Sequence, residues 1–390
     1  MTGRLRFAAI GLGQRIAAVL RAIKQAGAPF ELSAYVDPAP VGASILGENG
    51  IAIGRRFEDE RALLASGPYD LLLIGSPNHL HATQLALALD DGRSPIFIEK
   101  PIVRTEAESL ALAARLRAPM PPLFVGLVMR SAPIVREVLR TVRSGELGTI
   151  VSIDATEHLP PDHGAYLARN WRRKQEWGGS FLLDKVCHDF DILGAIADAR
   201  PARVASFGGR GSFRADRARR RDAAAYRAWP GGWAAQDDPF SSDSDVTDTQ
   251  TAIVEYENGV RLSFHASSHS GLRERRWYIA GTEGTLIADI DRNKLMWRHA
   301  LDPGAPVRSN FPLNELDHNG ADVAMAEDLI AALRKRAQFP VTAKQALEAG
   351  LTVMAIDKAM VSATVVDCSE MWRTFDTASN PYLSSPRRRG

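Results

Sequence analysis

The sequence predicts an α/β protein in which a doubly wound parallel sheet is followed by a second, strand-rich domain. Up to about residue 127, short apolar strands alternate with helical stretches through short connections, which is typical of parallel strands with crossover helices. A turn with two glycines separates the first strand from the first helix. Further along, Asn258-Gly259 lies between two strand-like runs and predicts a hairpin.

Composition excludes several classes of partner. A chain of 390 residues suffices for two or three domains, and 48 basic against 46 acidic side chains leave too little net charge to recruit nucleic acid or an anionic membrane. No apolar run approaches a bilayer span, and the first strand begins by about Leu5, without room for a signal peptide. Cys187 and Cys368 form neither a disulfide framework nor a zinc spacing. We therefore expect a cytoplasmic protein without a metal site.

The first glycine turn has the character of a dinucleotide site. Gly11-Leu12-Gly13-Gln14-Arg15-Ile16 joins the strand Leu5 to Ile10 to a helix, and such turns bring backbone N–H groups to a phosphate. Ile16 replaces the third glycine of the usual pattern, so the turn alone is a weak signal. The next strand, Phe30 to Val36, ends at Asp37, which suits the ribose hydroxyls of NAD and repels the extra phosphate of NADP. An acid in a strand-end turn is also common in its own right.

Two further strand ends carry polar side chains. Ser76-Pro77-Asn78-His79-Leu80-His81 follows the strand Asp70 to Ile74, and its histidines could cap the next helix or face solvent. Glu99-Lys100-Pro101 follows the strand Ile96 to Ile98, at the edge where parallel sheets bind ligands. A lysine there can polarise an oxygen or donate a proton, although a surface Glu–Lys pair is the plainer alternative.

A polar stripe marks one helix of the second domain. Asp184, His188 and Asp191 are spaced i, i+4, i+7 and so project from one face of an α-helix. Such a stripe is costly to bury unless its members are paired or face a polar cleft, and Asp184 can stabilise the imidazolium form of His188. A solvent-exposed helix face is the alternative that spacing alone leaves open.

Together these motifs resemble the Gfo/Idh/MocA oxidoreductases, the family of inositol 2-dehydrogenase and glucose–fructose oxidoreductase. The resemblance covers about residues 5 to 365. It implies a Rossmann domain over residues 1–127 and a C-terminal α+β domain over 128–365, built on a large, mostly antiparallel sheet. A flexible tail is expected at 374–390. The family also implies homodimers or homotetramers formed through the sheet of the second domain.

The resemblance further implies NAD(H)-dependent hydride transfer at a carbinol carbon of a sugar, a cyclic polyol or a related compound. His188 is expected to be the general base, Asp184 to orient its ring and Lys100 to stabilise the alkoxide. The expected cofactor contacts are Gly11, Leu12, Gly13, Gln14, Arg15, Ile16, Asp37, Ser76, Pro77, Asn78, His81, Glu99 and Lys100. The expected substrate contacts are Lys100, Trp171, Arg172, Asp184, His188 and Asp191.

Substrate choice is expected to depend on residues 158–177 and on the Arg/Asp/Ser/Gly-rich insertion 209–246, which is either an ordered flap or an irregular excursion. Two other functional classes remain open. The first is an NAD-dependent glycosidase that oxidises its sugar transiently, and the second is a non-catalytic protein that binds NAD or another ligand on the same fold.

Overall fold

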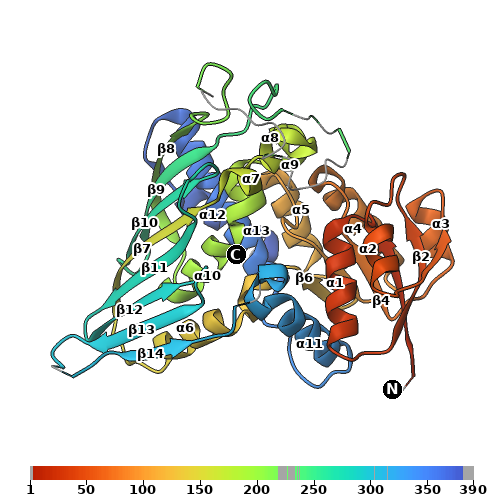
Figure 1. The fold of residues 1–390 in the computed structure, drawn as a ribbon, viewed down its shortest axis with the longest axis horizontal. Helices are drawn as coiled ribbons and strands as arrows, with labels where there is room; N and C mark the ends of the chain where they lie inside the picture. Colours follow the sequence, from red (N-terminus) through yellow and green to blue (C-terminus); the bar gives the residue numbers. More distant parts are fainter. Residues whose placement is uncertain are drawn as a thin grey trace, which may run out of the picture. The chain divides into compact units, whose positions relative to one another are not determined.

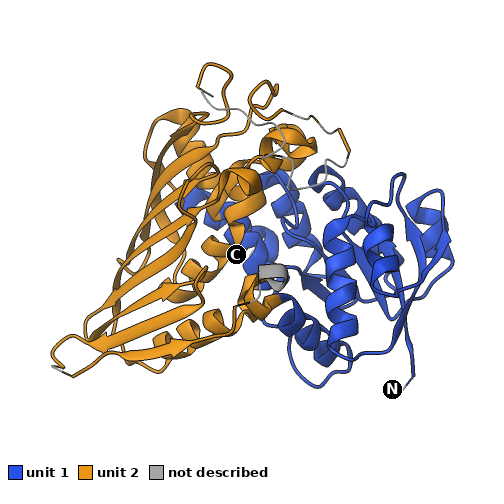
Figure 2. Ribbon diagram, viewed as in Figure 1, with its two compact units in different colours: residues 1–128, 322–351, 369–390 blue, residues 129–321, 352–368 orange. Residues whose placement is uncertain are grey.

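The computed structural model of the chain describes residues 3–217, 226, 233–234, 236, 238–302, 304–313 and 315–380. It contains two compact units, coloured separately in Figure 2. The first consists of Met1–Val128, Asp322–Leu351 and the segment that begins at Ser369, and the second of Met129–Ala321 and Thr352–Cys368. One parallel and one mostly antiparallel sheet are present, which confirms the predicted fold class.

Parallel strands joined by helices build the first unit (Figure 1). Its elements are β1 (Leu5–Ile10), α1 (Gln14–Gln25), β2 (Phe30–Val36), α2 (Gly42–Glu48), β3 (Ile53–Arg56), α3 (Glu60–Ala65), β4 (Leu71–Ile74), α4 (Asn78–Asp91), β5 (Ile96–Ile98), α5 (Glu106–Arg115), β6 (Leu123–Val125), α11 (Ala321–Leu333), the first part of α12 (Ala343–Ser362) and α13 (Ser369–Ser379). The strand order is β3-β2-β1-β4-β5-β6. Because the order reverses between β1 and β4, the carboxyl ends of these two strands border the crevice in which such sheets bind ligands.

Two glycines allow the close contacts at this crevice. Gly11 follows β1 with φ +81°, and a Cβ there would lie 2.4 Å from the backbone nitrogen of Ser76, which follows β4. Ile16 in α1 is fully buried, and a Cβ at Gly75 would lie 2.3 Å from its Cγ1. The helix therefore packs closely on the sheet although it lacks the third glycine of the usual turn, because the glycine stands on the strand end instead.

The division into domains differs from the one expected at the C-terminus. The part of the chain beyond Asp322 is shared between the units, and α13 packs against α5 in the first unit. The expected flexible tail from Thr374 is helical as far as Ser379, because Trp372 and Phe375 bury the apolar face of α13. The final ten residues lie outside the described part of the chain.

The second unit is a nine-stranded sheet with helices on one face (Figure 1). Its elements are α6 (Pro133–Arg143), β7 (Ile150–His158), α7 (Pro161–Gly164), α8 (Tyr166–Arg169), α9 (Gln175–Gly178), a π-helical turn (Leu182–Val186), α10 (Cys187–Ala197), β8 (Pro201–Gly209), β9 (Thr249–Tyr256), β10 (Arg261–Ser267), β11 (Glu274–Gly281), β12 (Gly284–Asp289), β13 (Lys294–His299), β14 (Val307–Asn310) and β15 (Val366–Asp367). The strand order is β14-β13-β12-β11-β7-β10-β9-β8-β15, and only β7 and β10 pair in parallel. The predicted hairpin at Asn258-Gly259 joins β9 to β10 and is confirmed.

The two faces of this sheet have different environments. On the inner face α10 packs against the strands, for example through the rings of Phe190 and Phe264, whose centroids are 4.9 Å apart. On the outer face Phe207 and Ile253 are 77% and 59% exposed, and no described helix of the unit covers them (Figure 1).

The contact between Ile16 and Gly75 is testable by a double-mutant cycle. Gly75→Ala should destabilise the protein by about 1–3 kcal/mol, because the new methyl group overlaps a buried side chain. Ile16→Ala should relieve the overlap, so the double variant should be more stable than the sum of the single changes, by about 1 kcal/mol or more. Urea denaturation followed by circular dichroism measures all four proteins, and strictly additive effects would contradict the proposed contact.

Candidate active site

The predicted cofactor residues of the first unit gather at one edge of its sheet. Each follows the carboxyl end of β1, β2, β4 or β5, and their turns contact one another. The N–H of Leu12 donates to Oδ2 of Asp37 over 2.6 Å, and the N–H of Ala39 donates to Oδ1 over 2.7 Å. Asp37 is therefore held in a fixed orientation beside the glycine turn.

Arg15 connects the glycine turn to the lysine turn. Its Nε donates to Oε1 of Glu99 over 2.9 Å, and its Nη1 donates to Oδ1 of Asp322 over 2.5 Å. Glu99 is only 4% exposed, and Gly126 makes room for it, since a Cβ there would lie 2.9 Å from the carboxylate. The alternative interpretation, a surface pair between Glu99 and Lys100, is therefore wrong, because Glu99 is buried and paired with Arg15. Asp322 was missed because its position in the sequence gives no signal of this contact.

His81 is buried and holds two turns together. Its Nδ1 lies 2.8 Å from the carbonyl oxygen of Pro101, and its Nε2 lies 3.0 Å from that of Ser76. Burial lowers the pKa of His81, while the two carbonyl oxygens and Glu99 favour the proton. Since the side chain is 1% exposed, we replace its predicted cofactor contact with a role in positioning the turns that carry Ser76 and Lys100.

The residues present at this edge fit a dinucleotide. Gly13 is the N-cap of α1 without a side-chain cap, and a Cβ there would meet only the carbonyl oxygen of Gly75, at 3.9 Å. Packing does not require glycine at that position, whereas a phosphate approaching the helix N-terminus would. Nη2 of Arg15 is buried and has no hydrogen-bond partner among the described residues. Ile16 can contribute only its backbone, because its side chain is buried against Gly75.

In the second unit the polar helix is not a regular α-helix. Asp184 lies in the π-helical turn, while His188 and Asp191 lie in α10, so the three do not form the predicted α-helical stripe. Extra residues in a helical turn occur frequently at functional sites. Oδ2 of Asp184 accepts hydrogen bonds from Tyr166 Oη and Arg172 Nε, each at 3.0 Å. The predicted contact between Asp184 and His188 stays a prediction.

Tyr166 was missed by the sequence analysis. It lies in α8, and burial followed by the charge of Asp184 raises its pKa well above the usual value, so the phenol remains a donor. Arg172 stacks on two aromatic rings, with its guanidinium carbon 4.1 Å from the centre of Trp171 and 5.1 Å from that of Tyr166. The predicted substrate residues Trp171 and Arg172 are thus joined to Asp184 within one cluster.

Asp191 has a different environment from the one predicted. Its two carboxylate oxygens accept from Nε and Nη2 of Arg130, at 2.5 and 3.0 Å, and both side chains are buried. This fork-to-fork pair occupies the carboxylate that was expected to hold a substrate hydroxyl. We therefore replace the predicted substrate contact of Asp191 with anchoring of α10.

Asp189 on the same helix faces the sheet. It is fully buried and accepts from Nε and Nη2 of Arg275 at 3.0 and 2.7 Å, and from the indole N–H of Trp277 at 3.3 Å. Glu157 on β7 lies 3.0 Å from the same arginine. This buried network joins the helix to the two central strands β7 and β11.

The described part of the insertion is ordered against the loop that carries Tyr166 and Arg172. Asp243 accepts from Arg173 Nε at 2.7 Å, and Asp245 accepts from the N–H of Gln175 at 2.7 Å. Arg169 donates to the carbonyl oxygen of Gln236. These contacts support the ordered alternative for those residues. Residues 218–225, 227–232, 235 and 237 lie outside the described part.

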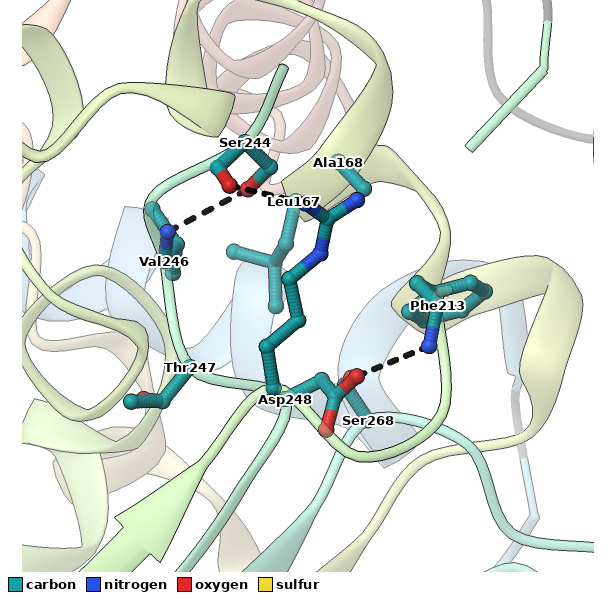
Figure 3. Close-up of a pocket in the computed structure, with 9 residues that line it drawn as sticks. Leu167, Ala168, Phe213, Ser244, Val246, Thr247, Asp248 and Ser268 are labelled. Atoms are coloured by element: carbon teal, nitrogen blue, oxygen red, sulfur yellow. Dashed lines mark hydrogen bonds between the residues drawn. The ribbon is translucent and has the colours of Figure 1, made fainter. Parts of the chain in front are cut away.

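A small pocket at the base of the insertion is a structural junction (Figure 3). The carboxylate of Asp248 accepts from three consecutive backbone N–H groups, of Gly211, Ser212 and Phe213, at 2.7–2.8 Å. Arg210 donates to the carbonyl oxygens of Ser242 and Ser244. Asp248 and Arg210 thus bond to backbone groups at the two ends of the insertion, and these hydrogen bonds hold the insertion in place.

Ser180 and Asp357 secure the start of the helical segment. Ser180 Oγ accepts from the N–H of Leu183 at 3.1 Å and is hydrogen-bonded to Asp357. Gln250 Nε2 also donates to Asp357, at 3.1 Å. Burial raises the pKa of this carboxyl to about 6, against the opposing effect of its two hydrogen bonds.

Among the residues that the structure describes, no helix is both long and apolar enough to cross a bilayer. The same residues contain no cluster of three or more histidine, cysteine or acidic side chains suited to a metal ion.

A Rossmann unit whose strand ends fit a dinucleotide, followed by a unit with a large sheet, defines a nucleotide-dependent oxidoreductase. The family model described as "Oxidoreductase family, NAD-binding Rossmann fold" matches residues 5–126, and the "GFO/IDH/MocA C-terminal domain" matches residues 135–287. The chain therefore belongs to the Gfo/Idh/MocA oxidoreductases, and its cofactor is NAD.

Similar proteins agree with this assignment. The 1,5-anhydro-D-fructose reductase of Ensifer adhaerens is 24% identical over 69% of this chain and 71% of its own length. The NAD⁺-dependent scyllo-inositol 2-dehydrogenase of Bacillus subtilis (strain 168) is 22% identical over 63% and 62%. A levoglucosan dehydrogenase solved with NADH and levoglucosan aligns with a TM-score of 0.76 at 20% identity, covering 94% of this chain and all of that one. At such identity the structural match establishes the fold alone.

Asp357 predicts a specific pH dependence of stability. Because its pKa is about 6 in the folded protein and 3.8 when unfolded, the unfolded state loses the proton first as pH rises. The contribution of Asp357 to stability therefore falls between about pH 4 and pH 6, by roughly 2–3 kcal/mol, and is constant above about pH 7. Asp357→Asn has a neutral side chain at every pH, and the other titrating groups contribute equally to both proteins. The unfolding free energy of the variant minus that of wild type should therefore rise by the same amount between about pH 4 and pH 6. A difference independent of pH in urea titrations would contradict it.

Proposed function

We propose that the protein is an NAD(H)-dependent dehydrogenase that oxidises or reduces a carbinol carbon of a sugar, a cyclic polyol or a related compound. The observation that carries this proposal is the buried Asp184, held by Tyr166 and Arg172 and located four residues before His188. The proposal pairs this fixed carboxylate with the imidazole of His188, an arrangement that general acid–base chemistry uses. The names of the sugar and polyol enzymes among the relatives agree with this substrate class.

The oxidation must remove the proton of a hydroxyl group as a hydride leaves the carbon that bears this hydroxyl. NAD supplies the hydride acceptor when it is bound. His188 takes the hydroxyl proton through its imidazole, which is the side chain best suited to exchange protons near neutral pH. Asp184 stabilises the imidazolium form, and the ammonium of Lys100 stabilises the alkoxide oxygen. Glu99 and His81 hold the turn that carries Lys100.

We also propose that the protein forms homodimers or homotetramers through the outer face of the nine-stranded sheet, in a cytoplasmic setting. Phe207 and Ile253 on the adjacent strands β8 and β9 are exposed on that face and would be buried by a second copy. Ile253→Lys should shift the sedimentation coefficient towards that of a monomer, because a charge would be buried in the interface. A wild-type protein that is monomeric at micromolar concentration would overturn this proposal.

The catalytic proposal predicts the effect of two substitutions. Lys100→Met and His188→Gln should each lower kcat by about 100-fold or more, because each removes a charge or proton transfer needed in the transition state. NAD affinity should change little. The measurement is the appearance of NADH absorbance with NAD and a panel of cyclitols, aldoses, sugar acids and glycosides.

Lys344→Met is the matched control, since Lys344 is exposed at the start of α12. Wild-type turnover in Lys100→Met would refute the scheme. Release of a glycoside's leaving group without net NADH would favour the glycosidase alternative. NAD binding without either reaction would favour a non-catalytic binding protein or a substrate outside the panel.

A further inference from the structure

Arg172 offers two terminal nitrogens that no described residue uses. A guanidinium has five N–H donors, and only its Nε is occupied, by Asp184 at 3.0 Å. The side chain is 25% exposed, so part of it is open to solvent. Both Asp184 and Trp171 are buried, at 1% and 8% exposure.

The orientation of this guanidinium is fixed before any ligand arrives. The indole of Trp171 supports its plane at 4.1 Å, and the bond from Nε to Asp184 fixes its rotation within that plane. A planar fork with two parallel N–H groups matches a carboxylate, which can accept from both nitrogens at once. Because the fork is already ordered, binding loses little side-chain entropy.

A partly buried imidazole lies beside this cluster. His163 packs against Tyr166, with ring centroids 5.8 Å apart. Burial first, and then the charges of Lys185, Arg273 and other basic groups, lower the pKa of His163 to about 2. The imidazole therefore stays neutral. The two basic groups are themselves paired, Lys185 with Glu157 and Arg273 with Asp291.

We propose that the substrate carries a carboxylate and that the terminal nitrogens of Arg172 bind it, so that the enzyme acts on a sugar acid or a carboxylated polyol. This substrate class rests on the proposed oxidation near Asp184 and His188. Asp184 then has two functions, since the same carboxylate supports the proposed base and orients the residue that selects the substrate.

The test compares matched substrates that differ in one carboxylate. D-glucose and D-glucuronate, with D-galactose and D-galacturonate, are assayed for NADH formation, with D-glucose 6-phosphate as a second anion. The acids should have the higher kcat/KM in the wild type. Arg172→Gln should lower kcat/KM for all the sugars, because it also removes the hydrogen bond to Asp184. For the acids it should lower kcat/KM by about 30-fold or more beyond that shared loss, mainly through KM.

Arg172→Lys should restore part of the loss, because it keeps the charge but lacks the planar fork. Arg140→Gln is the control, since Arg140 is 62% exposed and paired with Glu137 on α6. A general structural role for Arg172 would lower the rates of acids and neutral sugars equally, which would overturn the inference. Preference for neutral sugars or for the phosphate would overturn it as well.

Failure of the proposed oxidation can be separated from failure of this inference. Calorimetric titration of D-glucuronate into the protein with NADH measures binding without turnover. Binding by the wild type that Arg172→Gln abolishes, without NADH formation in the assay, would support the carboxylate site and count against the oxidation. Oxidation of neutral sugars with no discrimination by charge would support the oxidation and refute the carboxylate site. Absence of acid binding to every variant would also refute it.

Discussion

The buried ion pair between Asp189 and Arg275 is the interaction on which the geometry of the second unit depends. Asp189 is the neighbour of His188, so whatever fixes Asp189 against the sheet also fixes the rotation of the helix that presents His188. Apolar contacts alone would permit small rotations of a helix, whereas a bidentate pair with an additional indole donor has one satisfied geometry. The desolvation of both charges is offset only in that geometry.

Pairs between an acid and an arginine recur along the helical segment that contains His188. Asp184 is paired with Arg172, Asp189 with Arg275 and Asp191 with Arg130, and the three arginines come from the loop after α8, from β11 and from the start of the unit. Each acid therefore attaches the helical segment to a different element. In the first unit, Arg15 makes a comparable pair of contacts with Glu99 and Asp322, which fixes the lysine turn. Charge pairs thus act together with apolar packing in fixing the segments that carry Lys100, Asp184 and His188.

The sequence was sufficient to predict what local patterns encode. Strands β1 and β2, the hairpin at Asn258-Gly259 and the strand-end turns follow from apolar runs and turn chemistry, and they agree with the structure. Edge strand β3 was not predicted, because Ile53-Gly54-Arg55-Arg56 is exposed throughout and has no apolar alternation. The partners of Glu99, Asp184 and Asp191 could not be predicted either. Glu99 and Asp191 pair with arginines 84 and 61 residues away, and the partners of Asp184 lie 18 and 12 residues before it. No local pattern distinguishes these partners from surface side chains.

The π-helical turn illustrates a similar limit. Residues spaced i, i+4, i+7 lie on one helix face only if the α-helix is regular. The helix around Asp184 is not regular, because it contains a π-helical turn. Asp184 and Asp191 bind partners from different elements.

On the proposals above, substrate selection and proton transfer are connected but separable in this chain. The loop that carries Tyr166 and Arg172 is held from one side by Asp184, and from the other by Asp243 and Asp245 of the insertion. The pairs that fix Asp189 and Asp191 contain no residue of the insertion. Loops tolerate insertions that the elements they connect do not. The arrangement thus allows the recognised group on the substrate to change while the proposed proton-transfer residues keep their positions on a rigid helix.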